Sequence, residues 1–247
     1  MGLLAIIGGS GDSRLGIHKD PPAPAAQTPY GPTSAAIQRL TLCGQEVLFL
    51  ARHGSYHRIP PHRVNYRANL WALKAEGADR VVALAAVGGI SPVLGPRAFA
   101  IPHQLIDYTY GRDQSFHEGD ESRVVHVDFT EPYCEGLRAR LLEACALAGV
   151  PARDRAVYGA TQGPRLETAA EIARLERDGC DLVGMTGMPE AVLARELDLC
   201  YAALAYVVNW AAGKAPGPIR MQELEGHLGH CMERVEAILL ALAQTGP

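Results

Sequence analysis

The sequence predicts an α/β fold, a single domain over residues 1–247 with a mixed β-sheet flanked by helices. Its length and its 48% hydrophobic residues suit one globular domain with a sizeable core. Short apolar runs alternate with segments of helical period, which is typical of layered α/β sheets. Residues 99–127 have little helical signal, so we expect an antiparallel excursion or extra strands there.

Seven short apolar runs rich in β-branched residues predict the strands. Several runs are continuous rather than alternating, as in strands that are covered on both faces. In chain order they are residues 3–7, 47–50, 81–87, 99–106, 124–127, 182–185 and 201–208.

Apolar positions three and four residues apart predict five helices, for example Leu137, Leu141 and Cys145. Pro189 suits the first turn of its helix, and three glycines stand where helices should stop. The glycines are Gly77, Gly149 and Gly179. The helices are expected over residues 64–76, 131–148, 167–178, 189–197 and 221–244.

The charge balance excludes proteins that bind nucleic acid or anionic membranes through clustered basic residues, because 27 Asp and Glu outnumber 23 Lys and Arg. No apolar run of about 18 residues is present, and the N-terminus shows no basic region before an apolar stretch. We therefore expect a cytoplasmic protein without nucleic-acid or membrane partners.

The six cysteines have no C-x-x-C spacing, which argues against a zinc site and against the framework of a small secreted fold. We expect buried free thiols. The cysteines are Cys43, Cys134, Cys145, Cys180, Cys200 and Cys231.

The first predicted strand runs into the glycine-rich turn Gly8-Gly9-Ser10-Gly11-Asp12. Glycines let a backbone approach an anion closely, and the hydroxyl of Ser10 adds a donor. The turn matches neither G-x-x-x-x-G-K-[ST] nor G-x-G-x-x-G, so neither a nucleoside triphosphate nor a dinucleotide is indicated. A tight strand exit that needs positive φ explains the same glycines.

The second predicted strand is followed by Arg52-His53-Gly54-Ser55-Tyr56-His57. A guanidinium can fork onto two oxygens of a phosphate, which makes Arg52 a partner for the first glycine turn. A solvated surface arginine is the alternative. His53, His57 and His62 lack a nearby carboxylate set and an H-E-x-x-H frame, so we expect no metal site.

Four further positions lie near strand ends, where open α/β sheets place their ligands. Small residues around Ala86 leave room against the sheet, or simply pack closely. Glu167 stands near a helix N-terminus, which stabilises a carboxylate with or without a ligand. Thr186 can donate to an anion held at a helix start, and Asn209 can either serve a pocket or cap the following turn.

Taken together, these blocks resemble the purine nucleoside phosphorylase and methylthioadenosine phosphorylase family, in its trimeric branch. The resemblance covers residues 8–210, nearly the whole chain, with its motifs in order. The matching blocks are Gly8-Gly9-Ser10-Gly11, Thr28-Pro29-Tyr30-Gly31, Arg52-His53-Gly54 with His57, Val64-Asn65-Tyr66-Arg67-Ala68-Asn69, Gly163-Pro164-Arg165, and Met185-Thr186 through Pro189-Glu190.

The resemblance implies a twisted mixed sheet and a homotrimer with sites near the subunit interfaces. It implies phosphorolysis of a nucleoside, with inorganic phosphate as co-substrate and no metal or organic cofactor. In the family's pattern, phosphate is contacted by Ser10, Arg52, His53, the backbone N–H of Ala86, and Thr186. Asn209, Glu167 and His53 take the catalytic positions.

The resemblance also distinguishes the base. The 6-aminopurine enzymes have serine and aspartate where this chain has Glu167 and Asn209, whereas the 6-oxopurine enzymes have this chain's pair. Glu167 can accept the N1 proton of hypoxanthine, while adenine N1 is itself an acceptor. Asn209 can donate to O6 or N7 of the leaving purine. Buried groups left unpaired by the wrong base discriminate by roughly 10⁴-fold.

At the sugar end, apolar Met221 and Leu224 stand where ordinary purine nucleoside phosphorylases place a histidine for the 5′-hydroxyl. This resembles the methylthio pocket of the other branch. His126 resembles the histidine contributed there by a neighbouring subunit, and Met185 would lie under the ribose. Leu166 departs from the family's aromatic residue against the base.

The two ends together predict phosphorolysis of S-methyl-5′-thioinosine to hypoxanthine and 5-methylthioribose 1-phosphate. A purine nucleoside phosphorylase acting on inosine and guanosine remains an alternative if His227 or His230 meets the 5′-hydroxyl. Methylthioadenosine phosphorolysis is another, and a non-catalytic nucleoside-binding protein is a third. Residues 213–218, rich in Pro and Gly, are a candidate mobile lid beside the sugar.

Overall fold

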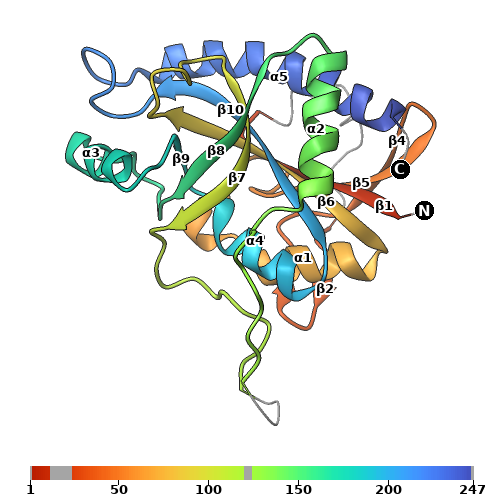
Figure 1. The fold of residues 1–247 in the computed structure, drawn as a ribbon. Helices are drawn as coiled ribbons and strands as arrows, with labels where there is room; N and C mark the ends of the chain where they lie inside the picture. The colour runs from red at the N-terminus through yellow and green to blue at the C-terminus, as the bar shows by residue number, and fades with distance from the viewer. Residues whose placement is uncertain (1, 12–23, 120–123, 246–247) are drawn as a thin grey trace.

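The computed structural model describes residues 2–11, 24–119 and 124–245, whose fold is shown in Figure 1. Asp12 of the first glycine turn lies outside the described residues. The strands are β1 (Leu3–Gly8), β2 (Gln27–Thr28), β3 (Gly31–Pro32), β4 (Gln38–Leu42), β5 (Gln45–Ala51), β6 (Ala78–Gly89), β7 (Phe99–Asp107), β8 (Ala152–Ala160), β9 (Leu182–Gly184) and β10 (Cys200–Trp210).

Eight of the described strands form one mixed sheet in the order β10-β7-β8-β9-β6-β1-β5-β4, and β10 also pairs with β6. This extra pairing closes β10, β7, β8, β9 and β6 into a ring, from which β1, β5 and β4 extend. β1 is parallel to β5 and β6, and β6 is parallel to β10. The carboxyl ends of these four strands therefore meet at one edge.

The predicted mixed α/β sheet is confirmed. Its antiparallel pairs are β4–β5, β6–β9 and β7–β10, so the expected antiparallel excursion after residue 99 is found in β7. Residues 201–208 of β10 are all buried, as the continuous apolar run predicts for a strand covered on both faces.

The helices are α1 (Tyr66–Ala75), α2 (Glu135–Leu147), α3 (Ala169–Arg177), α4 (Gly187–Glu196) and α5 (Met221–Gln244), with a short 3₁₀ turn at Pro61–Arg63. All five predicted helices are present. Gly77, Gly149 and Gly179 follow three of them with φ of +94°, +64° and +96°, which confirms them as helix stops. α2 packs against α5 and β10, and α1 packs against α4 (Figure 1).

The strand predictions err at residues 124–127 and at four strands that were not predicted. Residues 124–127 form no strand, and Val124 is 77% exposed, because the run pairs with no strand among the described residues. The unpredicted strands are β4, β8 and the two-residue strands β2 and β3. Residues 153–155, in the first half of β8, are exposed and charged. They hide the strand pattern of the buried second half of β8.

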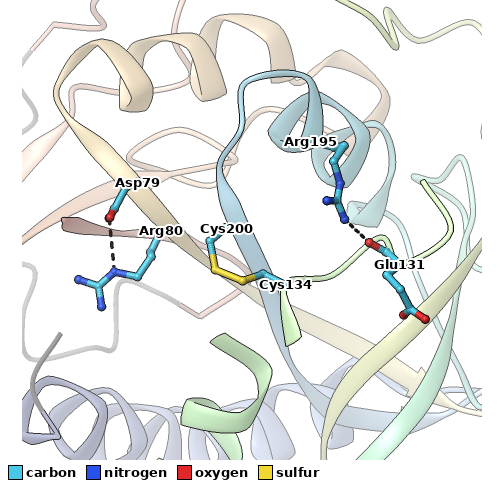
Figure 2. Close-up of a disulfide and its surroundings, with 6 residues drawn as sticks. All are labelled: Asp79, Arg80, Glu131, Cys134, Arg195 and Cys200. Atoms are coloured by element: carbon cyan, nitrogen blue, oxygen red, sulfur yellow. Dashed lines mark hydrogen bonds and ion pairs between the residues drawn. A yellow bond between two sulfur atoms is a disulfide. The ribbon is translucent and has the colours of Figure 1, made fainter. Parts of the chain in front are cut away.

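The expectation of free thiols is wrong for two of the six cysteines, because Cys134 and Cys200 form a disulfide (Figure 2). Cys134 is the residue before α2, and its N–H donates to the carbonyl of Tyr201 in β10 at 2.8 Å. The fold thus brings together two cysteines 66 residues apart, which spacing alone does not reveal. Cys145, Cys180 and Cys231 are buried free thiols, as expected, and Cys43 is free but exposed.

Candidate active site

A cavity of about 410 Å³ opens at the edge where β1, β5, β6 and β10 end. The sheet collects residues from distant parts of the chain, because each strand delivers its following turn to this edge. The predicted site residues that line the cavity are Ser10, Arg52, His53, Ala86, Leu166, Glu167, Met185, Thr186, Asn209, Met221 and Leu224. His57 lines it too.

His126 is the one predicted site residue that does not line this cavity; it is exposed on the segment before α2. Such a position suits the expected contribution to a neighbouring subunit, which stays a prediction. The roles expected for the lining residues also stay predictions, and the geometry below shows what each one offers.

The first glycine turn is held closely against β6. A Cβ on Gly9 would lie 2.6 Å from the carbonyl oxygen of Leu84, and Gly11 has φ of +90°. Tyr206 Oη donates to the carbonyl of Ser10 at 2.9 Å, which fixes the turn from β10. The glycines therefore serve the tight strand exit, and this exit is what presents Ser10 to the cavity.

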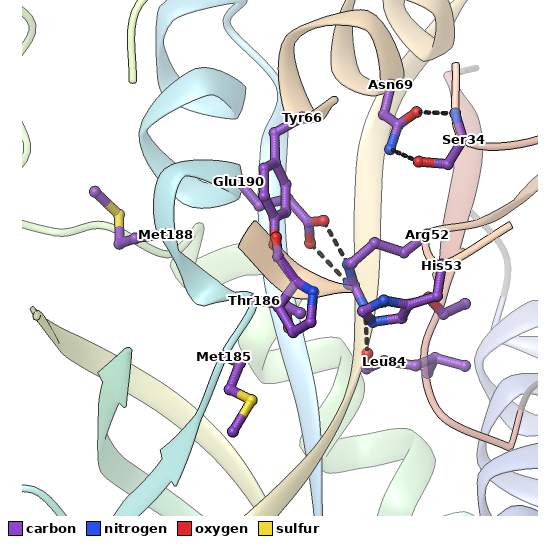
Figure 3. A network of polar contacts seen from close by, with 12 residues as sticks. Ser34, Arg52, His53, Tyr66, Asn69, Leu84, Met185, Thr186, Met188 and Glu190 are labelled. Carbon is purple, nitrogen blue, oxygen red and sulfur yellow. Dashed lines mark hydrogen bonds and ion pairs between the residues drawn. The ribbon is translucent and has the colours of Figure 1, made fainter. Parts of the chain in front are cut away.

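Arg52 is buried to 1% exposure, and its charge is neutralised inside the protein (Figure 3). Its Nε and Nη2 donate to the two carboxylate oxygens of Glu190 at 2.6 and 2.8 Å. Its Nη1 donates to the carbonyls of Gly8 and Leu84 at 3.1 and 3.0 Å. Four of the five N–H groups of Arg52 thus have acceptors within the protein. The pair of N–H groups that was expected to bind a phosphate donates to Glu190 instead, and one N–H remains for the cavity.

Glu190 is fully buried and also accepts from Tyr201 Oη at 2.9 Å. Burial alone would lower the pKa of Arg52, but the charge and hydrogen bonds of Glu190 outweigh it and hold that pKa above its ordinary value. A buried, doubly hydrogen-bonded pair of this kind fixes the guanidinium rather than leaving it free to follow a ligand. Sequence reasoning quoted Glu190 in a matching block but gave it no role.

His53 is held in one tautomer. Its Nδ1 lies 2.8 Å from the carbonyl of Ile59, and since a carbonyl only accepts, Nδ1 carries the proton. Burial, and then the charge of Arg52, lower the pKa of His53 to about 3. The same two causes lower the pKa of His57, whose ring centroid lies 4.5 Å from that of His53. At neutral pH His53 therefore offers Nε2 as an acceptor and adds no positive charge.

Glu167 and Asn209 both line the cavity. Thr161 Oγ1 donates to Glu167 Oε1 at 2.6 Å, which leaves Oε2 for a ligand. Asn209 Nδ2 donates to the carbonyl of Trp210 at 2.7 Å, so the amide nitrogen faces that carbonyl and keeps one further N–H. One acceptor and one donor are thus available to a ligand.

Apolar side chains also line the cavity. They include Met185, Met221 and Leu224, whereas neither His227 nor His230 lines it. His227 instead accepts from Arg97 Nε at 3.0 Å and borders an adjacent cavity of about 170 Å³, together with residues 213–218. The candidate lid therefore belongs to this adjacent cavity, and its mobility stays a prediction.

Arg112 is a second residue that sequence reasoning missed. Its Nη1 donates to the carbonyls of Met185 and Met188 at 2.9 and 2.6 Å, and its Nη2 donates to that of Gln162 at 2.7 Å. One guanidinium thus ties the loop that carries Glu167 to the turn that carries Thr186. An isolated arginine in an irregular segment gives no sequence signal for this role.

Within the described parts of the chain, no group of three or more His, Cys, Asp or Glu side chains could hold a metal ion. No helix in those parts is long and apolar enough to cross a membrane.

Comparison with known proteins adds three findings. A protein of Pseudomonas syringae pv. tomato named a probable S-methyl-5′-thioinosine phosphorylase is 56% identical over 240 residues, which cover 97% of each chain. The 6-oxopurine nucleoside phosphorylase of Pyrococcus furiosus is 43% identical over 96% of this chain and 91% of its own. The methylthioadenosine phosphorylase of Schistosoma mansoni in complex with adenine superposes with a TM-score of 0.91 at 31% identity, covering 100% of this chain and 92% of that one.

A family model described as the phosphorylase superfamily matches residues 3–244. The matched span contains the whole sheet and every residue of the cavity. The chain belongs to the phosphorylase superfamily.

Proposed function

We propose that this protein catalyses the phosphorolysis of S-methyl-5′-thioinosine to hypoxanthine and 5-methylthioribose 1-phosphate. The observation that carries the proposal is one cavity lined both by the polar pair Glu167 and Asn209 and by the apolar side chains of Met185, Met221 and Leu224. Four similar proteins at 54–56% identity are named probable S-methyl-5′-thioinosine phosphorylases, which supports the same substrate.

Arg52 and His53 would bring no net positive charge to the phosphate, because Glu190 pairs with Arg52 and His53 is neutral. Ser10, Thr186, the backbone N–H of Ala86 and the remaining N–H of Arg52 would hold the anion. His53 Nε2 would accept from a protonated phosphate oxygen or a sugar hydroxyl. Fixed donors of this kind position the nucleophile and need no reorganisation during the reaction. In this proposal inorganic phosphate is the co-substrate, and no metal or organic cofactor takes part.

In the reaction, a phosphate oxygen bonds to C1′ as the glycosidic bond breaks, and the electron pair of that bond moves onto the purine. Asn209 would donate its second Nδ2 hydrogen to N7 or O6, where this charge develops. Glu167 Oε2 would accept the N1 proton of hypoxanthine. With adenine, N1 and the carboxylate would both be acceptors, and the unpaired groups would weaken binding.

We expect a thioether rather than a hydroxyl at the 5′ position, because Met185, Met221 and Leu224 line the cavity and the two histidines of α5 that could meet a hydroxyl do not. Met221 is 60% exposed in the single chain. A homotrimer would cover this end if a neighbouring subunit contributed His126, and the exposed segment around Val124 suits such a contact. A cytoplasmic location and the absence of nucleic-acid and membrane partners complete the proposal.

The experiment is a side-by-side measurement of phosphate-dependent kcat/KM on methylthioinosine, methylthioadenosine and inosine. A preference for methylthioinosine over both supports the proposal. A preference for inosine would overturn the apolar 5′ pocket, and a preference for methylthioadenosine would overturn the roles of Glu167 and Asn209. Ligand-induced stabilisation without release of free base would identify a binding protein.

A further inference from the structure

Glu167 lines two cavities, the main one and a second one of about 380 Å³. Thr161 lines only the second cavity. A substrate in the main cavity would therefore meet Glu167 and not Thr161.

The hydroxyl of Thr161 has one proton, and two acceptors lie within its reach. Glu167 Oε1 is 2.6 Å away, whereas the carbonyl of Gly184 is 3.3 Å away. The shorter bond to a charged acceptor is the stronger of the two. The proton is thus directed to Oε1 of Glu167.

Thr161 is itself fixed on two sides. Its N–H donates to the carbonyl of Gly184 in β9 at 2.8 Å, and its own carbonyl accepts from Arg112 Nη2 at 3.3 Å. Arg112 also donates to the carbonyls of Gln162, Met185 and Met188. The backbone that carries the hydroxyl is therefore held in place, so the hydroxyl is positioned to orient the carboxylate.

We propose that Thr161 is a positioning residue that sets the preference for 6-oxopurines by holding one oxygen of Glu167 and aiming the other at N1–H of the base. This inference rests on the proposed function. An oriented carboxylate strengthens a hydrogen bond to an N1 proton, which only the oxopurine carries. An aminopurine gains nothing from that orientation, so loss of the hydroxyl should act on one class of base.

The test compares Thr161→Val, which keeps the shape and removes the donor, with Thr161→Ser, which keeps the donor. Tyr108→Phe is a matched control, because Tyr108 Oη donates to a carboxylate of Asp178 at 2.7 Å and borders the same second cavity without contacting Glu167. The readouts are kcat/KM on methylthioinosine and on methylthioadenosine, and calorimetric binding of hypoxanthine and adenine.

We expect Thr161→Val to lower kcat/KM on methylthioinosine and the affinity for hypoxanthine by roughly tenfold or more, the effect of one hydrogen bond to a charged group. The values for methylthioadenosine and adenine should change less than about threefold, and Thr161→Ser and Tyr108→Phe should keep the wild-type ratio. An equal loss on both bases, or no loss on either, would overturn the proposal. Thr161→Ala gives the same comparison if the valine variant does not fold.

Failure of the proposed function would look different. It would appear as a wild-type preference for methylthioadenosine, before any variant is compared. Binding of hypoxanthine and adenine to wild type and Thr161→Val would still decide the role of Thr161, because product binding does not depend on which nucleoside turns over fastest.

Discussion

Removal of Glu190 should be among the most damaging single changes in this protein. Glu190 and Arg52 are 0% and 1% exposed, and two short hydrogen bonds join them. Truncation to alanine leaves the guanidinium buried beside two backbone carbonyls with no counter-charge. Breaking a buried pair by removing one partner costs about 3–5 kcal/mol, a large part of the roughly 5–15 kcal/mol that holds a typical domain folded.

The assay is urea unfolding of Glu190→Ala, with Glu46→Ala as control. Glu46 also pairs with an arginine, Arg39, at 2.5 Å, but both side chains are about half exposed, so its loss should leave the free energy of unfolding nearly unchanged. Any folded Glu190→Ala should also show a raised KM for phosphate, because Arg52 loses the partner that orients it.

A double variant separates charge from packing. Arg52→Met with Glu190→Leu removes both charges and fills their space, so it should recover most of the stability lost in Glu190→Ala while phosphate-dependent turnover is abolished. A cost below about 1 kcal/mol for Glu190→Ala would refute the reasoning, since such values belong to exposed pairs. So would a double variant that turns over normally.

Three further predictions concern the rest of the cavity. Asn209→Asp combined with Glu167→Ser should shift the kcat/KM ratio toward the 6-aminopurine nucleoside, and an unchanged ratio would contradict the assigned base contacts. Met221→Ala should raise KM for the methylthio substrate more than for inosine, and equal effects would reduce Met221 to a packing residue. The pKa of His53 is lowered to about 3 in the folded protein, whereas the unfolded chain binds this proton below pH 6.5. The stability contributed by neutral His53 is therefore present above pH 6.5 and is lost as the pH falls toward 3. This predicts a free energy of unfolding that falls with pH by up to about 1.4 kcal/mol per unit in that window, a slope that His53→Gln should reduce and that would be unchanged if another group caused it.

Most of the fold could be predicted from sequence because its strands are covered on both faces. Such strands appear as continuous apolar runs, as in β6 and β10, and the helices between them end at glycines with positive φ. β8 was not predicted because its exposed half carries charges. A strand was wrongly predicted at residues 124–127 because β-branched residues favour strands only where a partner strand exists. The Cys134–Cys200 disulfide depends on the approach of α2 to β10, a tertiary fact.

The candidate site could likewise be predicted only in part. Several cavity residues, among them Ser10, Arg52 and Thr186, lie just beyond a strand end and could be placed from the sequence order, whereas Met221 and Leu224 of α5 came from the family resemblance. Residues that act behind them could not, because Glu190 is recognisable only by its contact with Arg52, Thr161 by its contact with Glu167, and Arg112 by the carbonyls around it. Glu190 and Arg112 contact residues that are 138 and 50 positions away, while Thr161 and Glu167 are six residues apart in an irregular loop. No local pattern encodes any of these contacts.

The most direct test of the central claim is an internal competition, in which the protein and phosphate are given methylthioinosine, inosine and methylthioadenosine in one mixture. The ratio of product formation then equals the ratio of kcat/KM values, and the sugar phosphates distinguish the two hypoxanthine nucleosides. We predict that 5-methylthioribose 1-phosphate and hypoxanthine form first, with little adenine. Early formation of ribose 1-phosphate, or of adenine, would contradict the claim that a 6-oxopurine end and a methylthio end meet in this cavity.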